Sequence, residues 1–273
     1  MLSHSEISTY LDCQRKWELV YKDGLQATNE HFQFGSMAHK VLETGLIPDE
    51  IEYCELKDAF GIPSWKNYFE KVIEDIDYYI GDEEIKYREL RIESKAFDLV
   101  GVIDLVTYNP KSYKYTLWDY KFTNTPRTDN SLRLDEQLTL YAILFSQEFD
   151  VPLAYIEVGY LSIPKKGITK PKILKTGGLS RAALASTTYE LYLEAIRENG
   201  LNPEDYTDVL EQLKYFVFVK GVRTSVPTKL AVNVAENIQN VIIDMKKEYV
   251  LCKHSFMCER CEFVKQCKGD VLI

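Results

Sequence analysis

The sequence predicts one α+β domain in which helices flank a mixed central sheet. Its 273 residues suffice for a single large core, and a hydrophobic content of 45% is ordinary for a globular protein. The candidate elements follow the order helices, three strands, one helix, more strands and final helices. That order is typical of α+β folds, since regular βαβ alternation is missing. We therefore expect residues 1–273 to form one domain.

The helices are predicted from apolar residues that recur three or four positions apart. The first begins at Ser3 or Ser5 and ends at Asp23-Gly24, because glycine commonly terminates helices. The same spacing predicts further helices over residues 35–45, 64–80, 132–149, 181–199 and 228–249.

The strands are predicted where β-branched residues dominate. Residues 88–107 are expected to form two strands with a turn near Asp98, and 99–106 is the most strand-like stretch of the chain. Asn109-Pro110 is a turn signal before the next strand. The remaining predicted strands cover residues 114–122, 155–163, 172–175 and 212–220.

Charge and hydropathy limit the classes of function. The formal net charge of −9 argues mildly against a protein that coats nucleic acid, although a local basic channel stays compatible with it. No apolar run is long enough to span a membrane, and the N-terminus lacks the features of a signal peptide, so a cytoplasmic location without membrane association is expected. A basic run comprises Lys165, Lys166, Lys170, Lys172 and Lys175. It could line a channel or form an ordinary solvated surface, and the solvated surface is favoured when the run is judged alone.

Two carboxylates are expected to meet in the sheet. Asp104 lies on one predicted strand and Asp119 on the next, two residues before Lys121, so Asp119 and Lys121 project from one face. Buried carboxylates are costly unless they are paired or bound to a cation, and such a pair suits Mg²⁺ or Mn²⁺. A nearby lysine can orient a water molecule or stabilise transition-state charge. The alternative is that both aspartates cap turns and Lys121 pairs with one of them.

Three further polar residues are candidates beside this pair. Gln137 and Tyr141 share one helix face and could hold a phosphate and a base, or belong to an ordinary amphipathic helix. His39 follows Gly35 on a predicted helix and could be a metal ligand or an ordinary histidine.

Four cysteines are predicted to bind a metal or cluster. Cys258, Cys261 and Cys267 are close in sequence, and Cys13 is the remote fourth candidate. In a chain without an export signal, clustered cysteines indicate metal chemistry, and four thiolates suit a structural zinc ion or a 4Fe–4S cluster. Three clustered cysteines with one remote partner favour iron–sulfur. Cys54 and Cys252 are expected to be ordinary thiols.

The order of these motifs resembles the RecB-like branch of the PD-(D/E)XK nuclease superfamily. The motifs are Gly-x-x-x-His, Gly-Val-Ile-Asp, Asp-Tyr-Lys and Gln-x-x-x-Tyr. The resemblance implies a restriction-endonuclease-like fold. It implies a metal site formed by His39, Asp104, Asp119 and the backbone carbonyl of Tyr120, with Lys121 as the catalytic lysine and Gln137 and Tyr141 as DNA contacts. It also suggests that Glu93 is the acidic residue on the preceding strand, although Glu93 could equally face solvent.

The cysteine motifs resemble those of iron–sulfur nucleases of the AddB and CRISPR-adaptation types. The N-terminal motif spans residues 5–21 and the C-terminal one 256–267; Gln14 replaces the proline of many relatives. The resemblance implies that residues 1–24 and 250–273 form one lobe around a 4Fe–4S cluster bound by Cys13, Cys258, Cys261 and Cys267. Such a cluster would fasten the two chain ends much as a long-range crosslink does.

The resemblance, and not the residues alone, implies a Mg²⁺- or Mn²⁺-dependent DNA exonuclease that acts on single-stranded ends. The resemblance places such an enzyme in phage or mobile-element recombination or in CRISPR spacer processing, with recombination or CRISPR-adaptation proteins as partners. One alternative is a non-catalytic DNA-binding or assembly subunit, against which the intact Asp104, Asp119 and Lys121 argue. Another is a nuclease stabilised by zinc.

Overall fold

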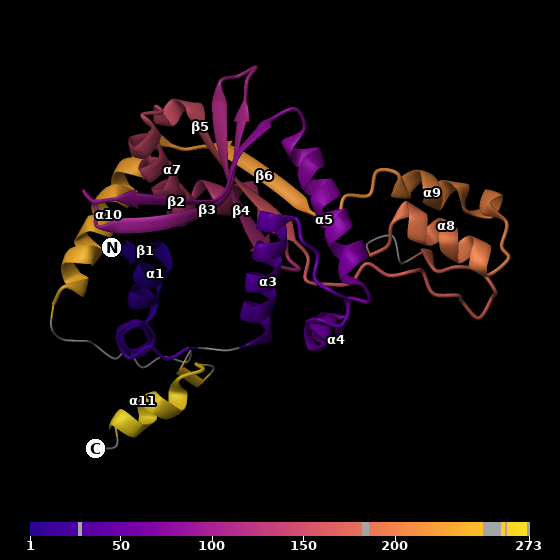
Figure 1. The fold of residues 1–273 in the computed structure, drawn as a ribbon, viewed down its shortest axis with the longest axis horizontal. Coiled ribbons are helices and arrows are strands. Elements are labelled where there is room, and N and C mark those ends of the chain that lie inside the picture. Colours follow the sequence, from indigo (N-terminus) through magenta and orange to yellow (C-terminus); the bar gives the residue numbers. More distant parts are fainter. Residues whose placement is uncertain (27–28, 182–185, 248–257, 260, 272–273) are drawn as a thin grey trace.

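The sheet is mixed and six-stranded. The computed structural model describes residues 1–273 except 27–28, 182–185, 248–257, 260 and 272–273. The strand order is β1-β3-β4-β5-β6, and β2 pairs with β3 outside this path (Figure 1). The strands are β1 Leu2–Ser3, β2 Glu84–Ser94, β3 Leu99–Asn109, β4 Lys114–Phe122, β5 Ile156–Ile163 and β6 Lys220–Ser225.

The strands β2 and β3 form an antiparallel hairpin, and β3 continues antiparallel to β4. Asp98 has a φ of 55° in the turn of this hairpin, which confirms the predicted turn. Strand β4 runs parallel to β5, and β6 closes the sheet antiparallel to β5. Parallel strands need a crossover connection, which here contains α6 Asp129–Arg133 and α7 Glu136–Phe149. The sheet is therefore mixed, as the sequence predicts.

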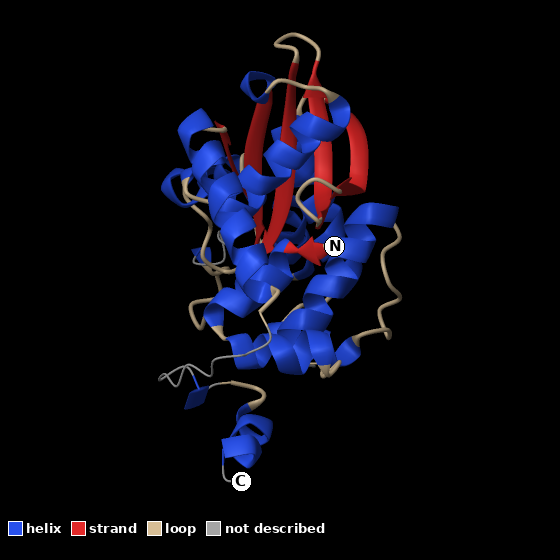
Figure 2. Cartoon of the chain, turned by 90° about the vertical axis from the view of Figure 1, so that its left-hand side faces the viewer, coloured by secondary structure: helices blue, strands red, loops and turns tan. Residues whose placement is uncertain are grey.

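Two hydrophobic cores lie against the sheet. Val106 and Leu117 belong to the core that includes α1, α7 and α10, whereas Leu105 and Trp118 belong to the core that includes α3, α4 and α5. Neighbouring strand residues thus alternate between the two cores, as the strand period of two requires. Figure 2 shows helices in front of the sheet and the C-terminus at the opposite end of the molecule from the uppermost connection between two strands. The helices of these layers are α1 His4–Asp12, α2 Gln14–Trp17, α3 Glu30–Thr44, α4 Cys54–Phe60, α5 Trp65–Ile80, α10 Thr228–Met245 and α11 Val264–Val271.

The predicted first helix is interrupted at Cys13. The backbone of Cys13 is extended (φ −159°, ψ 109°), and its sulfur accepts a hydrogen bond from the amide of Lys16 at the start of α2. A π-helical turn, η1 Glu18–Lys22, then completes the helical segment. The single helix over 132–149 is likewise wrong, because Asp135 separates α6 from α7 and caps α7 with its carboxylate.

A small helical lobe is inserted between β5 and β6 and projects from the body of the molecule (Figure 1). Its own core includes Tyr192 and Ile196 of α8 and Val209 of α9. The strand predicted over 212–220 is wrong: the lobe ends in helix, and the strand begins at Lys220. The predicted helix over 181–199 is shorter in the structure and starts at Tyr189. The lobe contains α8 Tyr189–Glu198, the 3₁₀ turn η4 Pro203–Tyr206 and α9 Thr207–Leu213, and a second 3₁₀ turn, η2 Leu153–Tyr155, precedes β5.

Candidate active site

The two predicted carboxylates meet where β3 and β4 stop pairing. The last paired residues are Leu105 and Trp118, so Asp104 and Asp119 come next on their strands. Asp104 Oδ2 accepts a hydrogen bond of 2.6 Å from the amide of Tyr120. Asp104 lies inside a strand, so the turn-capping alternative does not describe it.

A compact ligand set forms around Asp104. His39 Nδ1, on α3, lies 3.5 Å from Asp104 Oδ1 and 3.2 Å from Glu89 Oε1, on β2. Among the described residues, His39, Glu89 and Asp104 are the one set of three histidine, cysteine or acidic side chains whose donor atoms all lie within 4.8 Å of one another. The structure therefore brings His39 and Asp104 together as predicted, and adds Glu89.

Glu89 takes the place that the resemblance gave to Glu93. Glu93 is exposed and paired with Arg91, whose Nε lies 2.9 Å from Glu93 Oε1. It stands opposite Val100, four strand positions or about 13 Å from the level of Asp104. Glu93 is thus corrected to a surface residue. The φ of Glu89 is +48°, a left-handed conformation that is costly for any residue with a Cβ. Strained positions of this kind cluster at functional sites.

A hydrogen-bonded row leads from Asp119 to α7. Lys121 Nζ lies 2.8 Å from Asp119 Oδ2 and donates to Gln137 Oε1 at 3.3 Å. Gln137 Nε2 in turn donates to Tyr141 Oη at 3.2 Å. Tyr141 packs on Gly101, where an added Cβ would lie 2.6 Å from the tyrosine ring. The sequence-predicted Lys121, Gln137 and Tyr141 are therefore connected to the acidic pair.

Burial and like charge shift the titration of the site. Burial raises the pKa of Asp104 to about 7, and the nearby Asp119 carboxylate adds to the rise. Burial also raises the pKa of Asp119, against the opposing effect of Lys121. Burial alone would lower the pKa of His39, but the hydrogen bond to Glu89 and the charges of Asp104 and Glu89 outweigh it and raise that pKa. The cluster therefore attracts positive charge, whether a proton or a cation.

The donor set fits Mg²⁺ or Mn²⁺. Carboxylate oxygens are the ligands that these ions prefer, and Mn²⁺ also accepts imidazole. Asp119 Oδ2 is buried and accepts no hydrogen bond of suitable geometry, although Lys121 Nζ is near. An additional cation among Asp104, Asp119 and the His39–Glu89 pair would satisfy it. The backbone carbonyl of Tyr120 follows Asp119 directly and remains a predicted ligand.

The two ends of the chain adjoin near Cys13. Lys16 of α2 forms an ion pair of 2.9 Å with Glu262. Burial alone would lower the pKa of Lys16, but the hydrogen bond to Glu262 and the charge of Glu262 outweigh it and raise that pKa, and the nearby Cys261 adds to the rise. Cys261 follows Cys258 in one turn, where the amide of Cys261 donates to the carbonyl of Cys258 at 3.3 Å. Tetrahedral zinc would place its sulfur ligands about 3.8 Å apart, and the described cysteines do not form such a close set. Cys54 is exposed, and Cys252 lies outside the described residues.

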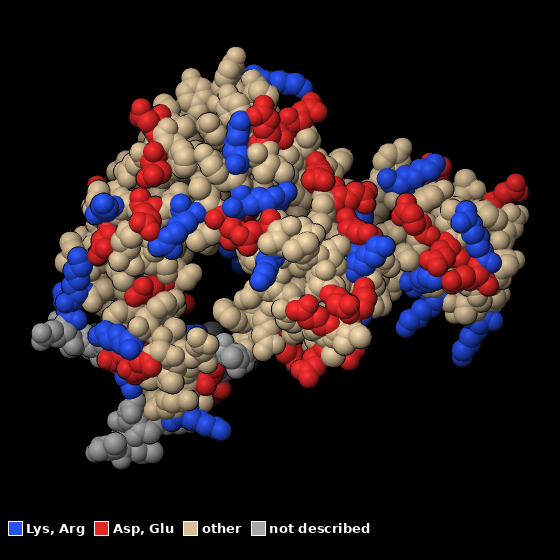
Figure 3. All heavy atoms as spheres, in the orientation of Figure 1, with Lys and Arg blue, Asp and Glu red and all other residues tan. Residues whose placement is uncertain are grey.

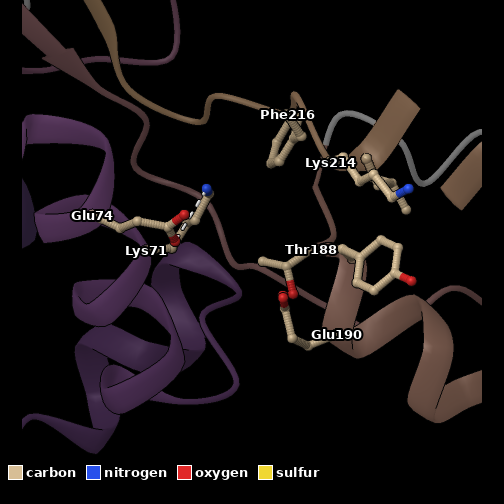
Figure 4. Close-up of a pocket in the computed structure, with 8 residues that line it drawn as sticks. Lys71, Glu74, Thr188, Glu190, Lys214 and Phe216 are labelled. Carbon is tan, nitrogen blue, oxygen red and sulfur yellow. Dashed lines mark ion pairs between the residues drawn. The ribbon is translucent and has the colours of Figure 1, made fainter. Parts of the chain in front are cut away.

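Two of the cavities between helices differ in their position relative to the site. One of about 160 Å³ lies between α1 and the start of α7, and its lining includes His4, Ser8 and Gln137, so it opens beside the hydrogen-bonded row. The other, of about 350 Å³, lies between α5 and the inserted lobe (Figure 4). Lys71 and Glu74 form an ion pair of 3.3 Å in its wall, and none of the sequence-predicted site residues lines it. The first cavity is therefore the one that belongs to the site.

Among the described residues, none of the helices has both the length and the apolar character that spanning a membrane requires.

The family described as the PD-(D/E)XK nuclease superfamily matches residues 1–268 of the chain. No curated protein matches the sequence.

The solved structures that are similar to this chain include two of low sequence identity. A "putative exonuclease" from Eubacterium rectale is 12% identical over 95% of this chain and 92% of its own, with a TM-score of 0.39. A protein named SSO0001 is 13% identical over 87% of this chain and 97% of its own, with a TM-score of 0.32.

Proposed function

Because this chain belongs to the PD-(D/E)XK nuclease superfamily, we propose that it is a Mg²⁺- or Mn²⁺-dependent exonuclease that hydrolyses DNA from single-stranded ends. The observation that carries the proposal is the position of Lys121. Its ammonium group is held by Asp119 and Gln137, one strand away from the His39, Glu89 and Asp104 cluster. A cation site next to a positioned lysine is the arrangement that phosphodiester hydrolysis needs.

The residues have distinct proposed roles. Asp104, Asp119 and His39 would bind the cation, and Glu89 would either bind it directly or hold the His39 ring in place. When bound, the cation would polarise the scissile phosphate and lower the pKa of a water ligand. Lys121 carries a fixed positive charge and would orient the attacking water and stabilise the charge that develops on the phosphate.

Gln137 and Tyr141 have positioning and contact roles in this proposal. The Gln137 carbonyl accepts a hydrogen bond from Lys121, so it directs the ammonium group toward Asp119. Its amide donates to Tyr141, whose ring is fixed against Gly101. Together they would present a polar edge to the DNA next to the scissile phosphate.

We further propose that Cys13, Cys258, Cys261 and Cys267 bind a 4Fe–4S cluster that fastens the chain ends. The proposal is supported by the cysteine spacing and by the ion pair between Lys16 and Glu262, which links the two segments. Anaerobically purified protein should then be brown, with broad visible absorption and close to four iron atoms per chain. A Cys258→Ala variant should be colourless and poorly folded. Colourless wild-type protein that carries zinc would refute the iron–sulfur assignment and leave the nuclease assignment intact.

The nuclease proposal is tested by digestion of end-labelled single- and double-stranded DNA with Mg²⁺ or Mn²⁺. Lys121→Ala should lose at least 100-fold in rate, as expected when one positioned transition-state donor is removed. The matched control is Lys114→Ala on the same strand: Lys114 pairs with Glu157 at 2.7 Å, away from the acidic cluster. Equal digestion by wild type and Lys121→Ala would contradict the catalytic role. Wild-type protein that binds DNA without cleaving it would instead indicate a DNA-binding or assembly subunit.

We propose a biological setting in DNA recombination or CRISPR adaptation. The resemblance of the cysteine motifs to those of AddB and CRISPR-adaptation nucleases supports phage or mobile-element recombination or CRISPR spacer processing as the setting. Recombination or CRISPR-adaptation proteins would be its partners.

A further inference from the structure

The segment that enters the inserted lobe is basic in an otherwise acidic chain. Residues 158–189 contain six Lys or Arg and no Asp or Glu, whereas the whole chain has 33 basic and 42 acidic residues. Figure 3 shows blue side chains that project from the lower edge of the lobe, while red side chains lie on the face toward the viewer. The charge of this segment is therefore a local feature that the net charge conceals.

The cations of this segment fall into two groups. Lys170 is neutralised by Glu194 at 2.9 Å and Glu198 at 2.7 Å, and Arg181 pairs with Asp208. The other four lysines have no ion pair with any residue that the structure describes: Lys165, Lys166, Lys172 and Lys175. A lysine without a carboxylate partner can bind an anion without first losing an ion pair.

Two of these lysines flank an exposed apolar tip. A tight hairpin forms where Ile173 bridges to Leu179 and the amide of Leu174 donates to the carbonyl of Gly178 at 2.7 Å. Ile173 is 55% exposed and Leu174 48% exposed, at the centre of the sequence Lys172-Ile173-Leu174-Lys175. The strand predicted over 172–175 is therefore wrong, because only Ile173 pairs, in a single isolated bridge. Large aliphatic side chains exposed between unpaired cations suit a ligand with both charged and apolar parts.

The segment starts at the catalytic end of the sheet. Ser162 of β5 stands opposite Lys121 of β4, and Lys165 follows three residues later. Lys165 Nζ lies 3.0 Å from Nδ1 of His31 on α3, the helix that also carries His39. Eight residues of helix separate His31 from His39, or about 12 Å. The unpaired lysines therefore begin close to the proposed cation site and lead away from it.

We propose that residues 165–180, here called the binding arm, hold the single-stranded DNA that extends from the active site. The unpaired lysines would contact successive phosphates, and Ile173 and Leu174 would pack against exposed bases. Single-stranded nucleic acid offers its bases to such contacts, whereas stacked duplex DNA covers their faces. This inference rests on the proposed nuclease function and adds the surface that binds its substrate.

The length of the path sets the substrate needed to reach the arm. From His39 to His31 is about 12 Å, and the seven residues from Lys165 to Lys172 span at most about 23 Å. At about 3.4 Å per stacked nucleotide this is roughly ten nucleotides. Oligonucleotides of about 20 nucleotides should use the arm, and those of about four should not.

The test compares two double variants that each remove two positive charges from the lobe. Lys172→Ala/Lys175→Ala removes unpaired lysines of the arm. The control, Arg181→Ala/Lys214→Ala, removes two cations of the lobe that lie outside the arm and are already paired with acidic residues. Binding of a fluorescent single strand of about 20 nucleotides is measured by anisotropy in a Lys121→Ala background, so that the DNA stays intact. Thermal melts establish that each variant is folded.

The arm variant should bind about tenfold more weakly at 0.15 M salt. It should also reduce the slope of log K against log salt by about 1.4, since each phosphate contact contributes about 0.7 for single strands. The control should change neither quantity. Ile173→Ser/Leu174→Ser should weaken single-strand binding without altering the slope, and should leave duplex binding unchanged.

The outcomes separate the two proposals. Equal binding by the arm variant and its control would overturn the binding arm, and DNA cleavage by wild type would still support the nuclease. Wild-type protein that neither binds nor cleaves DNA would overturn both. If the arm variant loses binding to anionic phospholipid vesicles but keeps its DNA affinity, the surface is a membrane contact and the inference is wrong.

Discussion

At Glu89, substitution by glycine should lower nuclease activity without lowering the free energy of unfolding. Its carboxylate contacts His39 at 3.2 Å, whereas its backbone is held at a φ of +48°. Glu89→Gly removes the carboxylate and relieves the backbone, and Glu89→Gln removes the charge while keeping the backbone strained. Both variants should lose nuclease activity. Only the glutamine variant keeps the energetic cost of the left-handed backbone conformation at residue 89.

The magnitudes follow from these two roles. Residues that ligate a metal or orient its ligands typically contribute 10- to 100-fold in metal affinity or activity. A left-handed conformation costs a residue with a Cβ about 1–2 kcal/mol, and glycine returns about 0.5–1 kcal/mol of that as unfolded-state entropy. Glu89→Gly should therefore be as stable as wild type or up to about 1.5 kcal/mol more stable. For a chain of this size that corresponds to a Tm increase of up to about 6 °C.

The assay measures cleavage rate against Mn²⁺ concentration together with metal-free thermal unfolding. The control is Glu93→Gln on the same strand, which should leave both unchanged because Glu93 is exposed and paired with Arg91. The reasoning about Glu89 is refuted if Glu89→Gly retains wild-type activity at low Mn²⁺ concentration. A loss of activity in Glu93→Gln with Glu89→Gly unaffected would restore the sequence-based assignment.

Three further predictions concern the core and the titration of the site. Asp75→Ala should lower the free energy of unfolding by about 2–4 kcal/mol in chemical denaturation, since two buried amide groups lose their acceptor; a change under 1 kcal/mol would show that water replaces the carboxylate. Gly101→Ala should reduce activity and destabilise the protein by about 1–3 kcal/mol, because its Cβ would displace the Tyr141 ring; an active, equally stable variant would show that the ring is not needed in place. The pKa of Asp104 is raised from 3.8 to about 7, so a proton stabilises the folded state at low pH, and this stabilisation is lost as pH rises through about 7. Mn²⁺ affinity measured by calorimetry should accordingly rise up to about pH 7 and then level off, and an affinity independent of pH between 5 and 7 would contradict the shift.

The fold and most of the site could be predicted because the relevant patterns are local. Asp104, Asp119 and Lys121 lie on two strands joined by a short turn, so strand periodicity and the turn signal suffice to bring them together. His39 and Gln137 lie on two different helices, α3 and α7. Only the order of the motifs predicted that both would lie beside the acidic pair. The structure confirms that convergence through direct contacts among the side chains.

The errors arise where a tertiary constraint overrides a local pattern. Glu89 and Glu93 both lie on β2 and have the same strand parity, so alternation cannot distinguish them. What selects Glu89 is the level at which β2 passes Asp104, a register that the sequence does not reveal. The apolar run near residues 215–219 reads as a strand, yet the strand that follows it, β6, is mostly exposed at the edge of the sheet. An edge strand without a buried face has no hydrophobic alternation to predict it.

The cost of the cluster links cation binding to folding. Three acidic side chains and a histidine are gathered where β3 and β4 stop pairing, burial raises the pKa values of both aspartates, and Glu89 is held in a strained conformation. Each feature opposes folding of the metal-free chain near neutral pH, and each is relieved or offset when positive charge enters the site. Any ion that binds the folded state alone must then stabilise it in proportion to the logarithm of its concentration. This locally unfavourable part of the fold is thus the part where we propose that a cation binds, and Lys121, whose charge is balanced by Asp119, would act beside that cation without displacing it.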